Sequence, residues 1–225
     1  VMDFIEGETI ARKILRDDEF ADTRPQLAAQ CGTMLARLHG LESDKMEGLP
    51  SSDAKGELSK YTEILRAHGH PHPVFELAIR WLADNVPPSQ ARCLVHGDFR
   101  LDNMLFDPSA SASSGAVSVT VVDWQTVGLG RGAVDVAYAL GSGLSTDDRR
   151  RVEESLVARY ANALAGAGVG VVDNVTHDYR LGATSGLAMS VIASQLVAST
   201  PRGDEMFAVM AERHAAQMVD NATME

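Results

Sequence analysis

The chain has 225 residues, 45% of them hydrophobic and 23% charged, with a formal net charge of −11. This length can bury a core in one large domain or two small ones, and the composition excludes a wholly disordered chain or coiled coil. The acidic balance argues against a nucleic acid or an anionic membrane as partner, because both call for a basic face. It is compatible with a cationic substrate.

The cysteines and the first residues of the chain bear on the cellular location of the protein. Cys31 and Cys93 match neither a metal-binding nor a redox spacing, so we interpret both as reduced core residues of a cytoplasmic protein. Asp3 and Glu6 interrupt any signal-peptide-like apolar run. The most apolar helical stretch, residues 187–198, is too short and polar to span a bilayer. The opening Val-Met-Asp suggests a piece of a longer protein.

The first half of the chain is predicted to be mainly helical. After a short strand-like start, "VMDFI", apolar residues recur at helical spacing over residues 25–41, with Thr23 as the expected N-cap. Two more helices are expected over residues 56–67 and 73–85, separated by "HGHPHP". This half contains no sequence pattern of a regular sheet.

Two short strands are predicted near the middle of the chain. A Ser/Ala/Gly-rich stretch, residues 107–115, is typical of a flexible connection between a strand at 104–106 and one at 117–124. Strands this short, inside a mainly helical chain, exclude a fold of regularly alternating strands and helices.

The last ninety or so residues are predicted to be helical. Ser145, with Asp148 three positions later, predicts a capped helix start before "RRRVEESLVARYANAL". Helices are then expected over residues 176–198 and 203–220.

The segment "LVHGDFRLDNMLF", residues 94–106, places a group of polar residues between apolar flanks. Asp98 precedes Asn103 by five positions, and Asp123 ends the β-branched run "VSVTVVD". A positioned carboxylate can accept the proton of a substrate hydroxyl, and hard oxygen ligands suit Mg²⁺. The spacing matches the phosphoryl-transfer arrangement of protein kinases. The alternative is a polar turn whose side chains bond only the local backbone.

With "HGDFRLDNMLF" and "VVDWQTVGLGRGAVDVAYALG", the chain resembles the aminoglycoside phosphotransferase family, a protein-kinase-like group similar also to choline and homoserine kinases. The resemblance includes "VMDFIEGETI" and "LARLHGL", but only the two central motifs are specific. It implies an α+β, mainly helical fold, a kinase-like C-terminal lobe with short strands around the catalytic loop. It also implies transfer of the γ-phosphoryl group of ATP or GTP to a small-molecule hydroxyl, aminoglycoside-like or another metabolite, with Mg²⁺.

The resemblance assigns roles to the central residues. Asp98 would be the catalytic base, and Asn103 and Asp123 would hold Mg²⁺ on the nucleotide phosphates. Arg100 stands where the family often has His, and would neutralise charge on the transferred phosphate. A solvated surface arginine is the alternative for that position.

Other residues would support the site. By resemblance, His96 would brace the catalytic loop and Asp135 would tie a helix to it. The chain start resembles the hinge between kinase lobes, where the backbone of Asp3 and Ile5 would bond the adenine.

The Gly-rich loop and strand Lys of an N-terminal kinase lobe have no counterpart before the catalytic motif. We therefore expect a hinge remnant over residues 1–8 and a C-terminal lobe over residues 9–225. The expected parts of this lobe are a helical substrate region at 42–92, a catalytic core at 93–143 and C-terminal helices at 145–222. Truncation, proteolysis or natural loss of the first lobe would each produce such a chain. Without that lobe, we expect weak nucleotide binding and negligible turnover.

Three other interpretations stay open. A kinase-like lobe kept as a catalytically silent binding or regulatory module would retain the fold without needing all the predicted catalytic residues. "GLGRGA", residues 128–133, fits a dinucleotide-binding fingerprint and would suggest an oxidoreductase, although a helical pattern occupies the place of the expected second strand. His68, His70 and His72 alternate as in short metal-binding tracts, but a solvated loop is the simpler interpretation.

Overall fold

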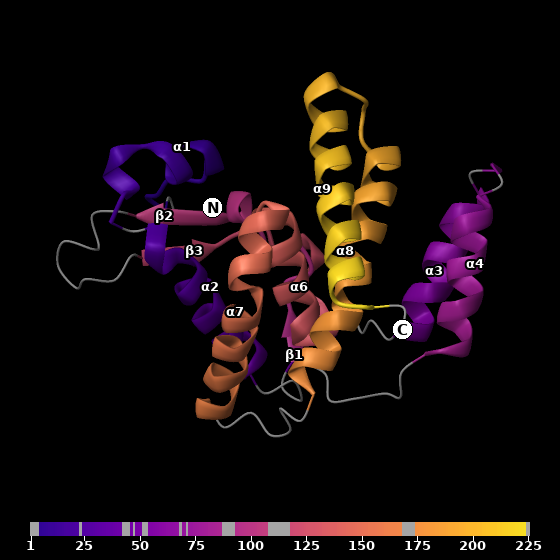
Figure 1. The fold of residues 1–225 in the computed structure, drawn as a ribbon, viewed down its shortest axis with the longest axis horizontal. Helices are drawn as coiled ribbons and strands as arrows, with labels where there is room; N and C mark the ends of the chain where they lie inside the picture. Colours follow the sequence, from indigo (N-terminus) through magenta and orange to yellow (C-terminus); the bar gives the residue numbers. More distant parts are fainter. Residues whose placement is uncertain are drawn as a thin grey trace.

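The structure, a computed structural model, describes most of the chain (Figure 1). The described residues are 5–22, 24–41, 46, 48–50, 54–67, 69–70, 72–86, 93–107, 118–167 and 174–223. They form a mainly helical fold with short strands, as the sequence predicts.

Helices make up most of the described chain, and the five predicted helical ranges are confirmed to within two residues at each end. The α-helices are α1 (Ala11–Arg16), α2 (Arg24–His39), α3 (Ala54–Ala67), α4 (Pro73–Asp84), α6 (Gly132–Gly143), α7 (Thr146–Gly166), α8 (Val175–Leu196) and α9 (Pro201–Asp220). Three short 3-10 turns are η1 (Asp18–Phe20), η3 (Leu101–Asn103) and η5 (Trp124–Thr126). Thr23, the expected cap of α2, lies outside the described residues.

The described strands form two antiparallel pairs. Strand β1 (Cys93–Val95) pairs with β4 (Gly128–Gly130), and β2 (Met104–Asp107) pairs with β3 (Ser118–Val121). The predicted strands on either side of the Ser/Ala/Gly-rich stretch are therefore confirmed. The dinucleotide-binding interpretation is wrong, because its glycines form an antiparallel strand and a helix start, whereas that motif needs a parallel βαβ unit.

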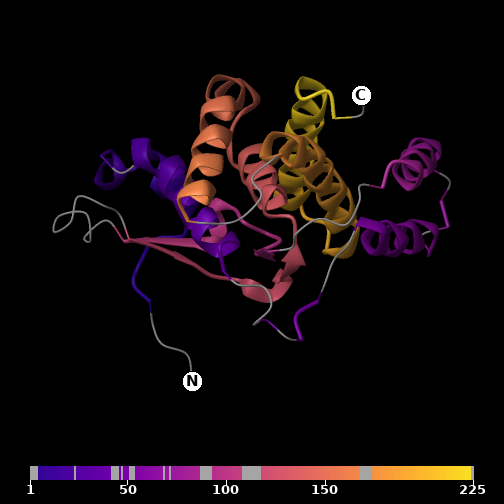
Figure 2. The ribbon, with the colours of Figure 1, turned by 90° about the horizontal axis from the view of Figure 1, so that it is seen from below.

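Helix α6 packs extensively against α8, α8 packs against α9, and α2 packs against α7 (Figure 1). Seen from below, the strands lie together on one side of these helices (Figure 2). Helices α3 and α4 lie side by side at one end of the molecule, and their described residues include none that is fully buried.

The core joins the predicted catalytic loop, residues 96–103, to the helices around it. Phe99 of that segment, together with Met104 and Phe106 of β2, is almost completely buried in the same apolar cluster as Leu35 of α2 and Ala137 of α6. Burying a phenylalanine side chain contributes roughly 1.5–3 kcal/mol to stability. Phe99 therefore anchors the middle of the polar loop to the apolar core.

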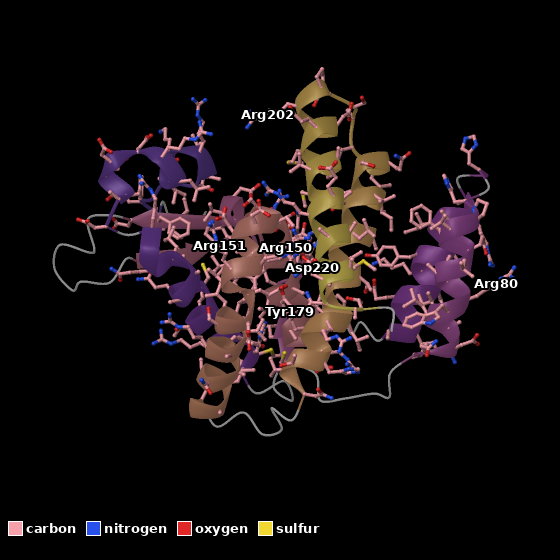
Figure 3. The ribbon with its side chains drawn as sticks, viewed as in Figure 1. Arg80, Arg150, Arg151, Tyr179, Arg202 and Asp220 are labelled. Carbon is pink, nitrogen blue, oxygen red and sulfur yellow. The ribbon has the colours of Figure 1, made fainter. Side chains whose placement is uncertain are left out.

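A buried polar network links α7, α8 and α9, which the sequence does not reveal. Arg149 of α7 is almost fully buried and pairs with Glu153 at 2.6 Å and with Asp220 of α9. Tyr179 of α8 donates its hydroxyl to Glu153 at 2.5 Å. Tyr179, Asp220 and Arg150 lie close together where the three helices meet (Figure 3). Because the buried guanidinium has two carboxylate partners, its charge is compensated.

The capped start of α7 is confirmed. Ser145 is the N-cap residue, and its hydroxyl accepts the backbone N–H of Asp148 at 3.2 Å and donates to the Asp148 carboxylate at 2.6 Å. These contacts satisfy a helix N–H that has no intrahelical partner. The hydrogen bond from Ser145 is the largest cause that lowers the pKa of Asp148.

Cys31 and Cys93 are both free thiols in the structure, as expected. Burial raises the pKa of each to about 12, so neither is a reactive thiolate at neutral pH. Among the described residues, none of the helices has the length and hydrophobicity needed to cross a membrane.

Candidate active site

The catalytic-loop segment, residues 96–103, runs from the end of β1 through the turn η3 to the start of β2. The sequence predicts this placement, because apolar residues stand on both sides of the polar motif. Both strands are paired to partners from later in the chain, so both ends of the loop are held by ladder hydrogen bonds. A loop fixed in this way can aim its side chains reproducibly.

His96 lies at the base of the loop and is completely buried. Its Nε2 lies 2.9 Å from the carbonyl oxygen of Val122, and its Nδ1 accepts the backbone N–H of Asp98 at 3.2 Å. A carbonyl can only accept, so the ring hydrogen is on Nε2. The Trp124 ring packs on the other side, with centroids 4.7 Å apart. His96 thus joins the loop to the chain that follows β3.

Asp135 of α6 is buried beneath the same loop. Its two carboxylate oxygens accept the backbone N–H groups of His96 at 2.7 Å and Gly97 at 2.9 Å. His39, at the end of α2, lies with Nε2 3.3 Å from Asp135, while its Nδ1 lies 2.6 Å from the Tyr160 hydroxyl of α7. Helices α2 and α6 therefore meet at the carboxylate that holds the loop, and α7 reaches it through His39.

His39 and Tyr160 were not among the predicted site residues. The available signal was the position of His39 in "LARLHGL", a polar residue directly after two core leucine positions of α2. Its partners come from 96 and 121 residues further along the chain. Sequence spacing cannot reveal contacts over that separation.

Gly97 occupies a backbone position that requires glycine. Its φ is +82°, and a Cβ there would lie 2.7 Å from the carbonyl oxygen of Thr126. Thr126 also donates its hydroxyl to the His96 carbonyl at 2.8 Å, which holds the two segments together. The glycine of the His-Gly-Asp motif therefore allows the loop to pass close to η5.

We expect Gly97→Ala to lower the free energy of unfolding by about 1–3 kcal/mol, because alanine would adopt a strained φ and contact Thr126. Urea denaturation would measure the change. The matched control is Gly32→Ala in α2, where a Cβ meets nothing within 4 Å. That variant should keep or raise stability by up to about 1 kcal/mol. Equal effects from the two substitutions would contradict the steric argument.

Asp98 and Asn103 lie in contact in the structure. The Asn103 side-chain amide donates to the Asp98 backbone carbonyl at 2.8 Å and to its Oδ2 at 2.9 Å. Asn103 is buried, whereas Asp98 is partly exposed. Because both bonds are donated by the amide nitrogen, the Asn103 side-chain oxygen is not used in them.

Arg100 lies between two acidic side chains of the loop. Its Nε is 3.5 Å from Asp98 Oδ1, and its Nη2 is 2.9 Å from Asp102 Oδ2. The arginine side chain is 23% exposed, so it is partly buried. A partly buried guanidinium beside the predicted base is able to bind an anionic oxygen.

Asp123 follows β3 in the left-handed backbone region, with φ 64° and ψ 59°, and is solvent-exposed. The preceding residue, Val122, donates its N–H to the Asn103 carbonyl at 2.9 Å and accepts from His96. A non-glycine residue in this conformation is strained, and such strain concentrates at functional sites. The backbone thus brings Asp123 and Asn103 to adjoining positions.

The chemistry of this donor set fits a hard divalent cation. Asn103 and Asp123 offer an amide and a carboxylate oxygen, and Mg²⁺ typically takes one or two protein oxygens together with phosphate oxygens and water. Within the described ranges, no cluster of three or more His, Cys, Asp and Glu side chains has metal-binding geometry.

Of the two predicted hinge residues, only Ile5 lies within the described part of the chain. Asp3 lies outside the described residues, and Ile5 is 45% exposed. Three residues after Ile5, Glu8 forms an antiparallel bridge with Phe106 of β2, with N···O distances of 2.9 and 3.0 Å. The N-terminal segment is therefore attached to the strand that leaves the catalytic loop.

The histidine tract does not form a described metal site. His68 lies outside the described residues, while His70 and His72 are both exposed, next to the start of α4. His72 instead packs its ring against Phe75, with centroids 5.6 Å apart. These positions agree with the solvated-loop interpretation.

Two solved structures share this architecture over 98% of the chain. One, from Ralstonia eutropha and described as a candidate aminoglycoside phosphotransferase, has a TM-score of 0.66 and 17% identity, with 72% of that chain covered. The other, an ethanolamine kinase of Plasmodium vivax, has a TM-score of 0.57 and 11% identity, with 63% covered. At these identities the likeness establishes the fold, and the predicted kinase-like fold class is confirmed.

The chain belongs to the phosphotransferase enzyme family, APH, whose family model matches residues 1–170. The predicted family resemblance is thereby confirmed. Mouse acyl-CoA dehydrogenase family member 11 is 28% identical over 148 residues, which cover 61% of this chain and 18% of that protein. The chain spans only 6–18% of the length of the first curated relatives that it matches.

Proposed function

We propose that this chain carries the catalytic core of a small-molecule kinase, which moves the γ-phosphoryl group of ATP or GTP to a hydroxyl. The observation that carries the proposal is the contact between Asp98 and Asn103, with hydrogen bonds of 2.8 and 2.9 Å. The turn at Asp123 adjoins this contact, because the preceding residue, Val122, donates its N–H to the Asn103 carbonyl. Membership of the phosphotransferase family supports the same reaction class.

In this mechanism Asp98 aligns the acceptor hydroxyl and accepts its proton as the new P–O bond forms. Asn103 and Asp123 would hold Mg²⁺, which when bound neutralises charge on the nucleotide phosphates. Arg100 would face the transferred group and stabilise its developing negative charge.

The remaining predicted residues act through the loop or at its edge. His96 and Asp135 would keep the catalytic loop in position through their hydrogen bonds to Val122, His96 and Gly97. The backbone of Asp3 and Ile5 would bond the adenine. A hinge over residues 1–8 and a C-terminal lobe over residues 9–225 form the proposed domain organisation.

We propose a small acceptor with a free hydroxyl and, given the net charge of −11, a cationic group. The descriptions of two structural neighbours, ethanolamine kinase and candidate aminoglycoside phosphotransferase, support this class. The free thiols support a cytoplasmic location.

A thermal-shift titration with Mg·ATP and Mg·GTP, made on the longest natural protein that contains this chain, tests the nucleotide site. We expect a magnesium-dependent stabilisation of roughly 2.7 kcal/mol at a hundred times Kd, lost in Asp123→Asn. The matched control is Asp147→Asn, because that side chain is 89% exposed on α7. It should keep the shift. If neither nucleotide stabilises the wild-type protein, the phosphotransfer proposal fails and a kinase-shaped binding module becomes the better account.

A further inference from the structure

His214 of α9 is a buried polar residue that the proposed mechanism does not use. Helix α9 packs against α6 and α8, and the fully buried His214 ring contacts both helices (Figure 1). The ring stacks on the Tyr138 ring of α6, with centroids 5.6 Å apart and planes at 15°. A Cβ on Gly141 of α6 or on Gly186 of α8 would collide with the imidazole. The two glycines therefore leave the space that the ring fills.

The hydrogen bonds of Gln217 fix which nitrogen of His214 carries the ring hydrogen. The Gln217 side-chain nitrogen donates to the Ala137 carbonyl at 3.1 Å and to the Tyr179 hydroxyl at 2.7 Å. A carbonyl only accepts, so the amide nitrogen faces Ala137 and the amide oxygen faces His214. That oxygen lies 3.2 Å from the His214 Nδ1 and can only accept, so the ring hydrogen is on Nδ1.

The second ring nitrogen of His214, Nε2, is buried without a hydrogen. It has no hydrogen-bond partner within the described part of the chain. A proton added to Nε2 would place a positive charge in the interior with no acceptor for the new N–H, which is costly. In the unfolded chain the same imidazole is solvated and takes up a proton at about pH 6.5. Protonation therefore favours states in which the ring is no longer buried.

The charged groups near His214 also oppose its protonation. Burial first, and then the positive charges of Arg149 on α7 and Arg213 on α9, lower the pKa of His214 to about 4. The hydrogen bond to Gln217 acts in the opposite direction but does not offset them.

The titratable neighbours on α6 and α8 supply no compensating negative charge. They are Tyr138, which stacks on the imidazole, and Tyr179, which reaches it through Gln217. Burial raises the pKa of both phenols, so both stay neutral. The Glu153 carboxylate accepts from the Tyr179 hydroxyl, so Tyr179 and Gln217 stand between this carboxylate and His214.

The folded and unfolded states therefore bind different numbers of protons as the pH falls. Because the pKa of His214 is lower in the folded state, its contribution to stability is complete above about pH 6.5 and is lost as the pH falls toward about 4. Asp148 and Asp220, whose pKa values are lowered from 3.8, titrate below this window.

We propose that His214 is a pH-sensitive switch: its neutral ring holds α9 against α6 and α8, and uptake of a proton from solvent on Nε2 releases the helix. Release would also remove a contact with the predicted catalytic loop, because the sulfur of Met210, one turn before His214, lies 4.0 Å from Nη1 of Arg100. The switch does not depend on the proposed kinase function.

Amide hydrogen exchange along α9 tests the switch in the longest natural protein that contains this chain. The variant is His214→Phe, which keeps an aromatic ring and removes the titrating group. Between pH 7 and pH 5, we expect the protection factors of the α9 amides to fall about 20-fold more in wild type than in His214→Phe. The matched control is His177→Phe, which removes an exposed histidine of α8 and should behave as wild type.

A second measurement on the wild-type protein decides the matter if His214→Phe does not fold. In protein labelled with ¹³Cε1-histidine, the His214 signal is assigned through its contact with the Tyr138 ring. We expect this signal to keep its neutral position down to pH 5, where the signal of His177 shows the charged imidazolium. Equal falls in α9 protection in wild type and His214→Phe would overturn the switch. So would a His214 ring that is charged at pH 5 while α9 stays protected.

Discussion

Asp98→Asn should lower phosphoryl transfer by about 10²–10⁴-fold, the usual contribution of a positioned general base. The substitution removes the proton acceptor but keeps the side-chain shape. Its amide oxygen can still accept the Asn103 N–H that now reaches Oδ2 at 2.9 Å. We therefore expect nucleotide binding to persist while turnover is lost. The measurement is kcat for phosphate release from Mg·ATP, with nucleotide affinity measured in parallel.

Asp102→Asn is the matched control for this result. Asp102 lies in the same loop, carries the same charge and also pairs with Arg100, at 2.9 Å, but its side chain is 49% exposed. An exposed pair is worth at most about 1 kcal/mol, so its activity should stay within about fivefold of wild type. Wild-type turnover in Asp98→Asn would contradict the assignment of the base. Equal losses in the two variants would point to the charge of the loop as a whole.

Asp135→Ala should lower the free energy of unfolding by about 3–5 kcal/mol. The substitution would leave the buried N–H groups of His96 and Gly97 without their acceptor and deprive His39 of its partner. These groups lie close to the protein interior, where water cannot replace the carboxylate oxygens of Asp135 without rearrangement. Urea denaturation followed by circular dichroism would measure the loss.

Two further variants test whether the loss of stability comes from the buried Asp135 carboxylate. Asp135→Asn keeps one acceptor oxygen, so its stability should fall between wild type and Asp135→Ala. Asp147→Ala removes a carboxylate that is 89% exposed and pairs with Arg150 at 3.8 Å, and it should cost about 1 kcal/mol or less. A loss below 1 kcal/mol in Asp135→Ala would show that the loop does not depend on this carboxylate.

The sequence by itself determined six of the eight described α-helices, the β2–β3 hairpin and the composition of the predicted catalytic loop. These features are encoded locally. Helical spacing of apolar residues, the Ser145–Asp148 cap and the Ser/Ala/Gly connection each act over a few positions. The Asp98–Asn103 contact was also predictable, because both residues lie on one short loop between paired strands. The roles of Asp3 and Ile5 in adenine binding stay predictions.

Only the tertiary structure decided what surrounds that loop. The pairing of β1 with β4, the joining of His39, Tyr160 and Asp135, and the stacking of His214 on Tyr138 unite residues tens to more than a hundred positions apart. Such contacts depend on how whole helices pack and on small residues that let them approach, as Gly141 and Gly186 do for His214. Local spacing carries no information about which helix meets which. The sequence therefore predicted which residues form the candidate site, and helix packing decided how they are held.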